Sequence, residues 1–185
     1  MLTVALGIAA LLAWVGFEVA FRAPGEARNW QGGARDQAST RLLLVAFAAA
    51  AVVPWLLGRV GFGTLGEAAW AGVALAAAGL AVRAWGMRTL GQAYSRTLRT
   101  TSDQRLVTEG PYHWVRHPGY LGSIAVWVGA ALAFHSWLAA LVVALLMLVA
   151  YGWRIRAEER MLAEHFGDGY RSYAAHTARL IPGIY

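Results

Sequence analysis

The sequence contains no cysteine and no lysine, and it is poor in charged residues altogether. Without cysteine, the chain has no disulfide, no thiolate metal site and no cysteine nucleophile. Only 14% of its residues are charged, whereas a soluble domain has about 25%. Together with 58% hydrophobic residues and a mean hydropathy of +0.47, this deficit indicates a protein embedded in a membrane.

The few charges that are present are mostly positive, with a formal net charge of +6 and sixteen arginines. A strong basic excess is one sign of a nucleic-acid partner. Membrane proteins, however, also gather cationic residues on their cytoplasmic loops. We therefore predict membrane lipids, and not nucleic acid, as the surroundings of this chain.

Apolar runs predict an all-α integral membrane protein with five transmembrane helices. A helix needs about 20 mostly apolar residues to cross a bilayer. The expected spans are residues 2–21, 41–57, 67–87, 120–134 and 137–153. His135 and Ser136 leave room only for a tight hairpin between the last two, and residues 23–40 are expected to form a polar loop. Most tryptophans fall near expected span ends, as in an interfacial aromatic belt.

The distribution of arginine predicts how these spans are oriented. Fifteen of the sixteen arginines fall in the segments 22–41, 83–116 and 154–179, and only Arg59 is left for the opposite side. Because cytoplasmic loops are enriched in Lys and Arg, we expect the N-terminus outside and the C-terminus in the cytoplasm. The expected location is therefore a membrane that the chain crosses several times.

Two polar stretches interrupt the apolar pattern on the expected cytoplasmic side. The first, residues 104–120, contains most of "GPYHWVRHPGYLG", and the second is residues 154–182. They flank the last two expected spans, one on each side. Since those spans form a hairpin, the two stretches must be neighbours in space.

The first stretch is built around "RHPGY". Pro118 lacks an N–H and disfavours helix at His117, so His117 is free to face a pocket. Gly119 stands at the entry of a helix, where free N–H groups bind carboxylates. A capped loop at the membrane surface is the alternative interpretation. The i,i+4 spacing of His113 and His117 suits a metal only on a helix, which Pro118 opposes, so we predict no metal site.

The second stretch contains Arg154 and Glu158, four residues apart on one helix face. They lie where the fifth expected span leaves the bilayer. Ionisable residues at that depth usually face the protein interior or an aqueous cavity. A surface ion pair of a few tenths of a kcal/mol is the alternative.

Taken together, the two stretches resemble the isoprenylcysteine carboxyl methyltransferase family and its bacterial relatives. The matching segments are "LVTEGPYHWVRHPGYLG" and "RIRAEERMLAEHFGDGYRSYAAHTARLIPG". The shared pattern is GPY-x-x-x-RHP-x-Y-x-G, a helical hairpin, R-x-x-x-EE, FG-x-x-Y and R-x-IP. The resemblance covers residues 104–183. It divides the chain into transmembrane helices at 1–87 and a methyltransferase module at 88–185, with the cofactor pocket under the last hairpin.

The resemblance implies a membrane enzyme that uses S-adenosyl-L-methionine. Because it includes bacterial relatives, the expected location is a bacterial inner membrane, with the active site facing the cytoplasm. Arg154 would face and orient the methyl acceptor, a lipophilic or lipidated molecule that enters from the bilayer. The residues that would bind the cofactor are Gln104, Arg105, Leu106, Val107, Tyr112, His117, Pro118, Gly119, Tyr120 and Glu158.

Several questions stay open at this point, including the oligomeric state. The acceptor group is a carboxylate, as in isoprenylcysteine, or else a phospholipid amine or a thiol. An amine must lose a proton, which would recruit a carboxylate such as Glu159 as base. The alternative enzyme is a small membrane reductase using NADPH, since sterol reductases have a similar C-terminal module but are usually longer. A non-catalytic scaffold is a third possibility.

Overall fold

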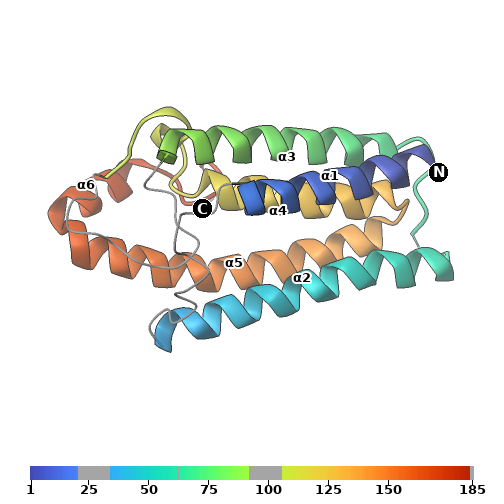
Figure 1. Ribbon diagram of the computed structural model, residues 1–185, viewed down its shortest axis with the longest axis horizontal. Helices are drawn as coiled ribbons and strands as arrows, with labels where there is room; N and C mark the ends of the chain where they lie inside the picture. The colour runs from blue at the N-terminus through green and yellow to red at the C-terminus, as the bar shows by residue number, and fades with distance from the viewer. Residues whose placement is uncertain (21–33, 62, 92–105, 184–185) are drawn as a thin grey trace.

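A computed structural model describes residues 1–20, 34–61, 63–91 and 106–183. The described residues form helices and no strand longer than an isolated bridge, which confirms the all-α prediction (Figure 1). In chain order these are α1 (Leu2–Ala20), α2 (Ala34–Val60), α3 (Ala69–Leu90), the short 3-10 helix η3 (Gly110–His113), α4 (Pro118–Ala133), α5 (Trp137–Phe166) and α6 (Asp168–His176).

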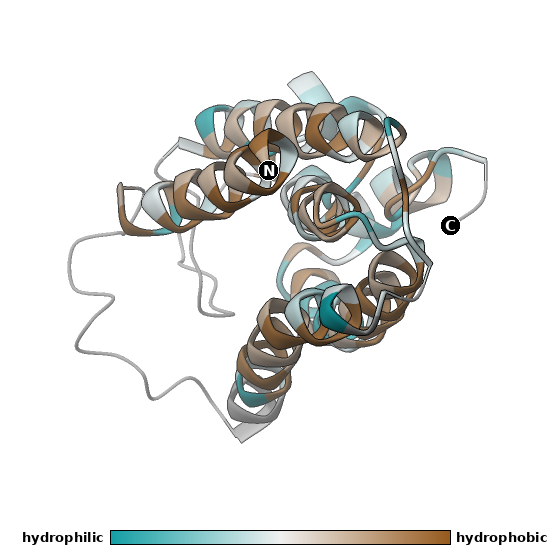
Figure 2. Cartoon of the chain, turned by 90° about the vertical axis from the view of Figure 1, so that its right-hand side faces the viewer, coloured by the Kyte–Doolittle hydropathy of each residue, from teal (hydrophilic) through white to brown (hydrophobic). Residues whose placement is uncertain are grey.

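Four of the described helices are long and apolar enough to cross a membrane: α1, α2, α3 and α5. The expected fourth span, residues 120–134, is instead the 16-residue helix α4. At 1.5 Å per residue it is about 24 Å long, less than the roughly 30 Å of a hydrocarbon core. Figure 2 shows α4 in the middle of the bundle, with the other long helices around it.

One other expected boundary was wrong. Residues 34–40, expected in a loop, belong to the first turns of α2. Helix α5 continues past the expected span to Phe166, which agrees with the expected helix through Arg154 and Glu158. In both places a polar helical segment extends beyond the apolar run, because it can leave the bilayer or pack against protein. The expected division of the chain between residues 87 and 88 falls within α3, and it stays a prediction.

The long helices alternate in direction. The start of α1 meets the α4–α5 turn, since Thr3 Oγ1 lies 2.8 Å from His135 Nε2. The turn also holds the α2–α3 connection: Leu65 N donates to His135 O (2.8 Å) and Trp137 N to Gly63 O (3.0 Å). The predicted tight hairpin at His135 and Ser136 is therefore confirmed. At the opposite end lie the last turns of α1, α3 and α5, the first turns of α2 and α4, and α6 (Figure 1).

Helices α3 and α4 approach each other through glycine. A Cβ built on Gly79 would lie 2.7 Å from Gly122 O, and one built on Gly129 would lie 2.5 Å from Ala76 N. Only a missing side chain allows backbones this close, as is common where membrane helices associate. This contact sets where the first turn of α4 lies against α3.

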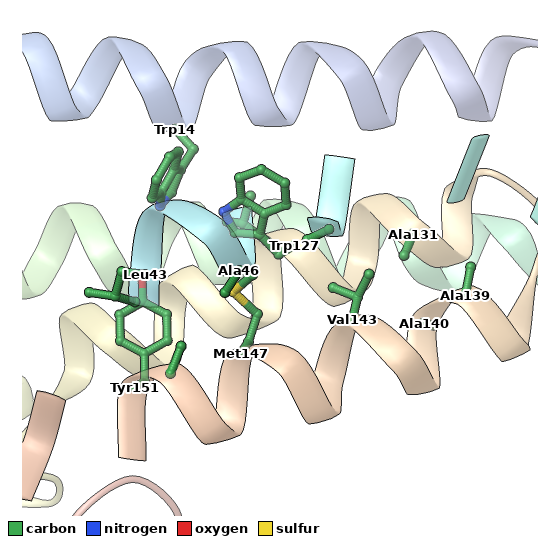
Figure 3. Close-up of a cluster of buried hydrophobic side chains, with 13 residues drawn as sticks. Trp14, Leu43, Ala46, Trp127, Ala131, Ala139, Ala140, Val143, Met147 and Tyr151 are labelled. Carbon is green, nitrogen blue, oxygen red and sulfur yellow. The ribbon is translucent and has the colours of Figure 1, made fainter. Parts of the chain in front are cut away.

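A cluster of buried hydrophobic side chains joins α4 to α1, α2 and α5 (Figure 3), and aromatic rings make several of its contacts. Trp127 of α4 stacks on Phe47 of α2 (ring centroids 5.3 Å apart) and meets the edge of Trp14 of α1 (5.6 Å). Phe47 also contacts Tyr151 of α5. Trp14 and Trp127 are buried, so these two do not belong to an interfacial belt.

We expect Gly129→Ala to lower the free energy of unfolding by about 1–3 kcal/mol, because the new methyl group overlaps the Ala76 backbone. Thermal unfolding in detergent measures this, at roughly 2–4 °C per kcal/mol. Gly152→Ala in α5 is the matched control, since a Cβ added there would meet no neighbouring segment within 4 Å. Equal losses from the two variants would contradict the packing account.

Candidate active site

Four of the sequence-predicted residues converge at the end of the bundle that carries α6. His117 Nδ1 lies 3.8 Å from Glu158 Oε2. Tyr120 OH donates a hydrogen bond to the same Glu158 oxygen (2.7 Å) and accepts one from Arg154 Nε (3.2 Å). The Tyr120 ring also stacks on the His117 ring, with centroids 5.5 Å apart. The predicted meeting of the two polar stretches is thus confirmed.

Local sequence explains how His117 reaches this cluster. Pro118 is the first residue of α4, and His117 before it has a non-helical backbone, as predicted. The His117 side chain is 4% exposed, and its Nε2 makes no hydrogen bond within the described part of the chain. That nitrogen lies 3.4 Å from Glu159 Oε1. The Glu159 carboxylate therefore faces this side of the imidazole ring.

Arg154 is buried, at 4% exposure, so the alternative of a surface ion pair is wrong. Its Nη1 lies within hydrogen-bond distance of Ser39 Oγ (3.2 Å) and Thr40 Oγ1 (3.3 Å) in α2. The guanidinium is therefore held between α4, α5 and α2. Sequence reasoning missed both hydroxyl residues, because they lie where a loop was expected and belong to no motif.

Glu159 has a structural role in this arrangement. Its Oε1 accepts from Arg116 Nε and its Oε2 from Arg179 Nε, both at 2.8 Å. The suggestion that Glu159 serves as a base for an amine acceptor does not fit, since both carboxylate oxygens already hold guanidinium groups. Glu159 instead ties the loop before α4 and the C-terminal segment to α5.

The C-terminal segment runs beside the "RHP" loop and completes this attachment. Arg116 N donates to Ala178 O (2.8 Å) and His117 N to Arg179 O (3.1 Å). Arg116 Nη1 also donates to the carbonyls of Ala174 (2.7 Å) and Thr177. The backbone of His117 is thereby fixed from outside its own helix.

Helix α6 contributes one more contact to the loop. Tyr173 OH donates to Tyr112 O (2.6 Å). Burial raises the pKa of the Tyr173 hydroxyl to about 12, although nearby Arg116 acts in the opposite direction. The hydroxyl therefore keeps the proton that this hydrogen bond requires.

The other predicted site residues lie around the cluster or outside the described part of the chain. Tyr112 and Pro118 are buried, and Tyr112 OH lies 3.5 Å from Gly86 O of α3. Gly119 is in the first turn of α4, and Leu106 and Val107 are half-buried ahead of η3. Gln104 and Arg105 lie outside the described residues.

The fold and the site define a multi-pass helical membrane protein. At one end of its bundle, a cluster of ionisable side chains from α5 contacts His117 and Tyr120 at the start of α4. A model of the isoprenylcysteine carboxyl methyltransferase (ICMT) family matches residues 72–164, half of the chain, so the protein belongs to this family. The resemblance seen in the motifs is thereby confirmed. The match includes α4 and most of α3 and α5, whereas α1 and α2 lie outside it.

Individual relatives agree with this assignment. The protein-S-isoprenylcysteine O-methyltransferase of Schizosaccharomyces pombe is 31% identical over 105 residues, 56% of this chain and 44% of that protein. The enzyme of the same name from Saccharomyces cerevisiae is 33% identical over 115 residues, 61% of this chain and 48% of that protein. The chain thus spans about half the length of these curated relatives.

A solved structure is similar as well. The eukaryotic intramembrane Ras methyltransferase ICMT superposes with a TM-score of 0.66 at 26% sequence identity. The similarity covers 75% of this chain and 52% of that one. Over most of this chain, the arrangement of the helices is therefore shared with a membrane methyltransferase.

We expect Glu159→Gln to loosen the C-terminal segment, because the neutral amide no longer pairs with Arg116 and Arg179. A hydrogen bond to a charged group contributes roughly 1.5–3 kcal/mol, so trypsin cleavage after Arg171 and Arg179 should rise about tenfold or more. Mass spectrometry of timed digests measures the rate. Asp168→Asn, which removes the exposed Asp168–Arg171 pair, is the control for cleavage after Arg179. An unchanged rate in the Glu159 variant would contradict this role.

Proposed function

We propose that this protein is an integral membrane methyltransferase that uses S-adenosyl-L-methionine to methylate the carboxylate of a lipophilic or lipidated acceptor. The observation that carries the proposal is the double hydrogen bonding of Tyr120. Its hydroxyl joins Glu158, on the proposed donor side, to Arg154, on the proposed acceptor side. The named relatives, protein-S-isoprenylcysteine O-methyltransferases, supply the reaction class.

The residues of the donor half fit S-adenosylmethionine, which carries an ammonium, a carboxylate and ribose hydroxyls. The Glu158 side chain is 26% exposed and accepts only one described hydrogen bond at Oε2, so it can accept another from an ammonium or hydroxyl. His117 Nε2 is buried and without a hydrogen bond within the described residues. When bound, the cofactor supplies an electrophilic methyl group on a sulfonium.

Further residues complete the proposed donor site. Gly119 lies in the first turn of α4, at a helix N-terminus, which suits a carboxylate, although the N–H groups of Tyr120 and Leu121 in this turn already donate to His117 O. Leu106, Val107, Tyr112, Pro118 and Tyr120 would line the rest, as the family resemblance implies. The His117 N–H is bonded to the C-terminal segment and the Gly119 carbonyl to Arg83, so this part of the donor site is fixed and would hold the donor in one orientation. Methyl transfer is an in-line displacement, and orientation supplies much of the acceleration of such a reaction.

The acceptor half favours a carboxylate. Arg154 presents a planar guanidinium, whose charge-assisted hydrogen bonds favour an anion such as a carboxylate. Its contacts with Tyr120, Ser39 and Thr40 hold that plane in place. A carboxylate needs no base, whereas an amine does, and Glu159 is already engaged by two arginines. We therefore rank the carboxylate above the amine.

The membrane arrangement is part of the proposal. Five crossings, with α4 as a short central one, place the N-terminus outside and the site at the cytoplasmic face of a bacterial inner membrane. The alternating helix directions and the gathering of arginines at the site end support this arrangement. A polar donor then arrives from the cytosol and a lipophilic acceptor from the bilayer. The reductase alternative receives no support from the named relatives.

We expect the purified protein to bind S-adenosylhomocysteine, and Glu158→Gln to weaken this binding about tenfold, since losing one charged hydrogen bond costs roughly 1.4 kcal/mol or more. Isothermal titration calorimetry measures the Kd. Arg154→Lys should leave the Kd within about twofold but reduce the rate of methyl transfer. The reason is that lysine keeps the positive charge but lacks the planar guanidinium that orients the acceptor. No binding by the unmodified protein, or tighter binding of NADPH, would overturn the proposal.

The labelled product should be a methyl ester. Membranes containing the protein, incubated with radiolabelled S-adenosylmethionine, should yield a lipophilic label that mild alkali releases as volatile methanol. Methylated amines and thiols keep their label under alkali, so the same treatment separates a carboxylate acceptor from the other two classes. Membranes containing Arg154→Lys serve as the control. A label that resists alkali would exclude the carboxylate.

A further inference from the structure

Two charged side chains that belong to none of the motifs described above meet inside the apolar part of the bundle. Glu18 is the only charged residue of α1, and its Oε1 forms an ion pair with Arg83 Nη2 of α3. The two side chains are 18% and 6% exposed. Ionisable groups within membrane helices are costly and usually have a function.

The second amino group of Arg83 reaches α4. Nη1 donates to Gly119 O (2.8 Å) and to Ser123 Oγ (2.6 Å), and Trp14 Nε1 donates to the same Ser123 oxygen (2.9 Å). The Arg83 guanidinium also lies over the Trp14 ring, 5.6 Å from its centroid. Three helices, α1, α3 and α4, are thus joined at the first turns of α4.

Those turns carry the donor half of the site. Gly119 stands between Pro118 and Tyr120, two residues from His117. A shift of the Gly119 carbonyl along α3 would therefore move the backbone N–H groups and the His117 and Tyr120 side chains together. The glycine contact between α3 and α4 sets their distance, and Arg83 adds a directional bond at one point along that contact.

We propose that Arg83, held by Glu18, is a positioning residue for the methyl donor: it fixes the first turn of α4 through the Gly119 carbonyl. This inference rests on the proposed function. Stability alone does not account for the pair, because replacing a buried ion pair by apolar residues of similar size is often neutral or stabilising. Since α1 lies outside the family match, Glu18 would make the first helix part of the donor site in this chain.

The test compares a paired apolar replacement with single ones. Glu18→Leu alone leaves the Arg83 charge buried without this partner and should lower the Tm. Glu18→Leu with Arg83→Met removes both charges, so the Tm should recover to within a few degrees of the unmodified protein. The bond to Gly119 is still missing in the double variant. Its Kd for S-adenosylhomocysteine and its KM for S-adenosylmethionine should rise about tenfold, while the KM for the acceptor stays unchanged.

Two further variants keep the outcome decisive. Arg83→Lys keeps a positive charge for Glu18 but lacks the guanidinium that also reaches the Gly119 carbonyl. We therefore expect a smaller rise in the Kd for S-adenosylhomocysteine, with no change in the KM for the acceptor. Arg88→Met, at an exposed position of the same helix, should behave like the unmodified protein.

The possible results separate the inference from the function it rests on. If the unmodified protein binds S-adenosylhomocysteine and the folded double variant binds it equally well, Arg83 has no positioning role. If the double variant does not fold, unchanged donor binding by Arg83→Lys overturns the inference in the same way. Equal changes in the KM of donor and acceptor would also overturn it. Failure of the unmodified protein to bind overturns the proposed function itself.

Discussion

A charged side chain buried in a membrane protein needs a partner, and this requirement organises the end of the bundle where the site lies. Arg83, Arg116 and Arg154 come from different segments, and each is held by acceptors from other segments. Such groups are expensive to bury unless they are hydrogen-bonded and neutralised. Pairing them draws together helices that apolar packing alone would leave free to slide, since lipid provides no hydrophobic drive between helices.

The two halves of the candidate site depend on this pairing in different ways. The donor half is anchored by backbone contacts, with His117 between the C-terminal segment on one side and Arg83 bonded to nearby Gly119 on the other. The acceptor half is anchored by side chains, with Arg154 between Tyr120 and the α2 hydroxyls. Tyr120 belongs to both halves. A change that moves its hydroxyl would therefore disturb donor and acceptor together.

Some site residues were predictable and others were not, for physical reasons. His117 and Glu158 could be brought together from the sequence because a hairpin of two apolar helices must return the chain to the same surface. Ser39 and Glu18 gave no such signal. A serine in an expected loop and a single glutamate near the end of an apolar run are compatible with many structures, and only the packing of α2 and α1 supplies their partners. Glu159 was suggested from the sequence as a base for an amine acceptor, a role that does not fit its hydrogen bonds with Arg116 and Arg179.

The sequence by itself determined an all-α membrane protein, the α4–α5 hairpin and the convergence of two polar stretches. The signals were its composition, the length of its apolar runs and the positions of proline and glycine. These features can be read locally because they depend on backbone preferences and on burial in lipid. Only the tertiary structure decided that α4 is short and central, that Arg154 is buried against α2, and that α1 is joined to the first turn of α4. These features depend on which helix faces contact each other. In a bundle of Ala, Leu and Val, many pairings of faces are nearly equal in energy until glycine contacts and buried charge pairs select one.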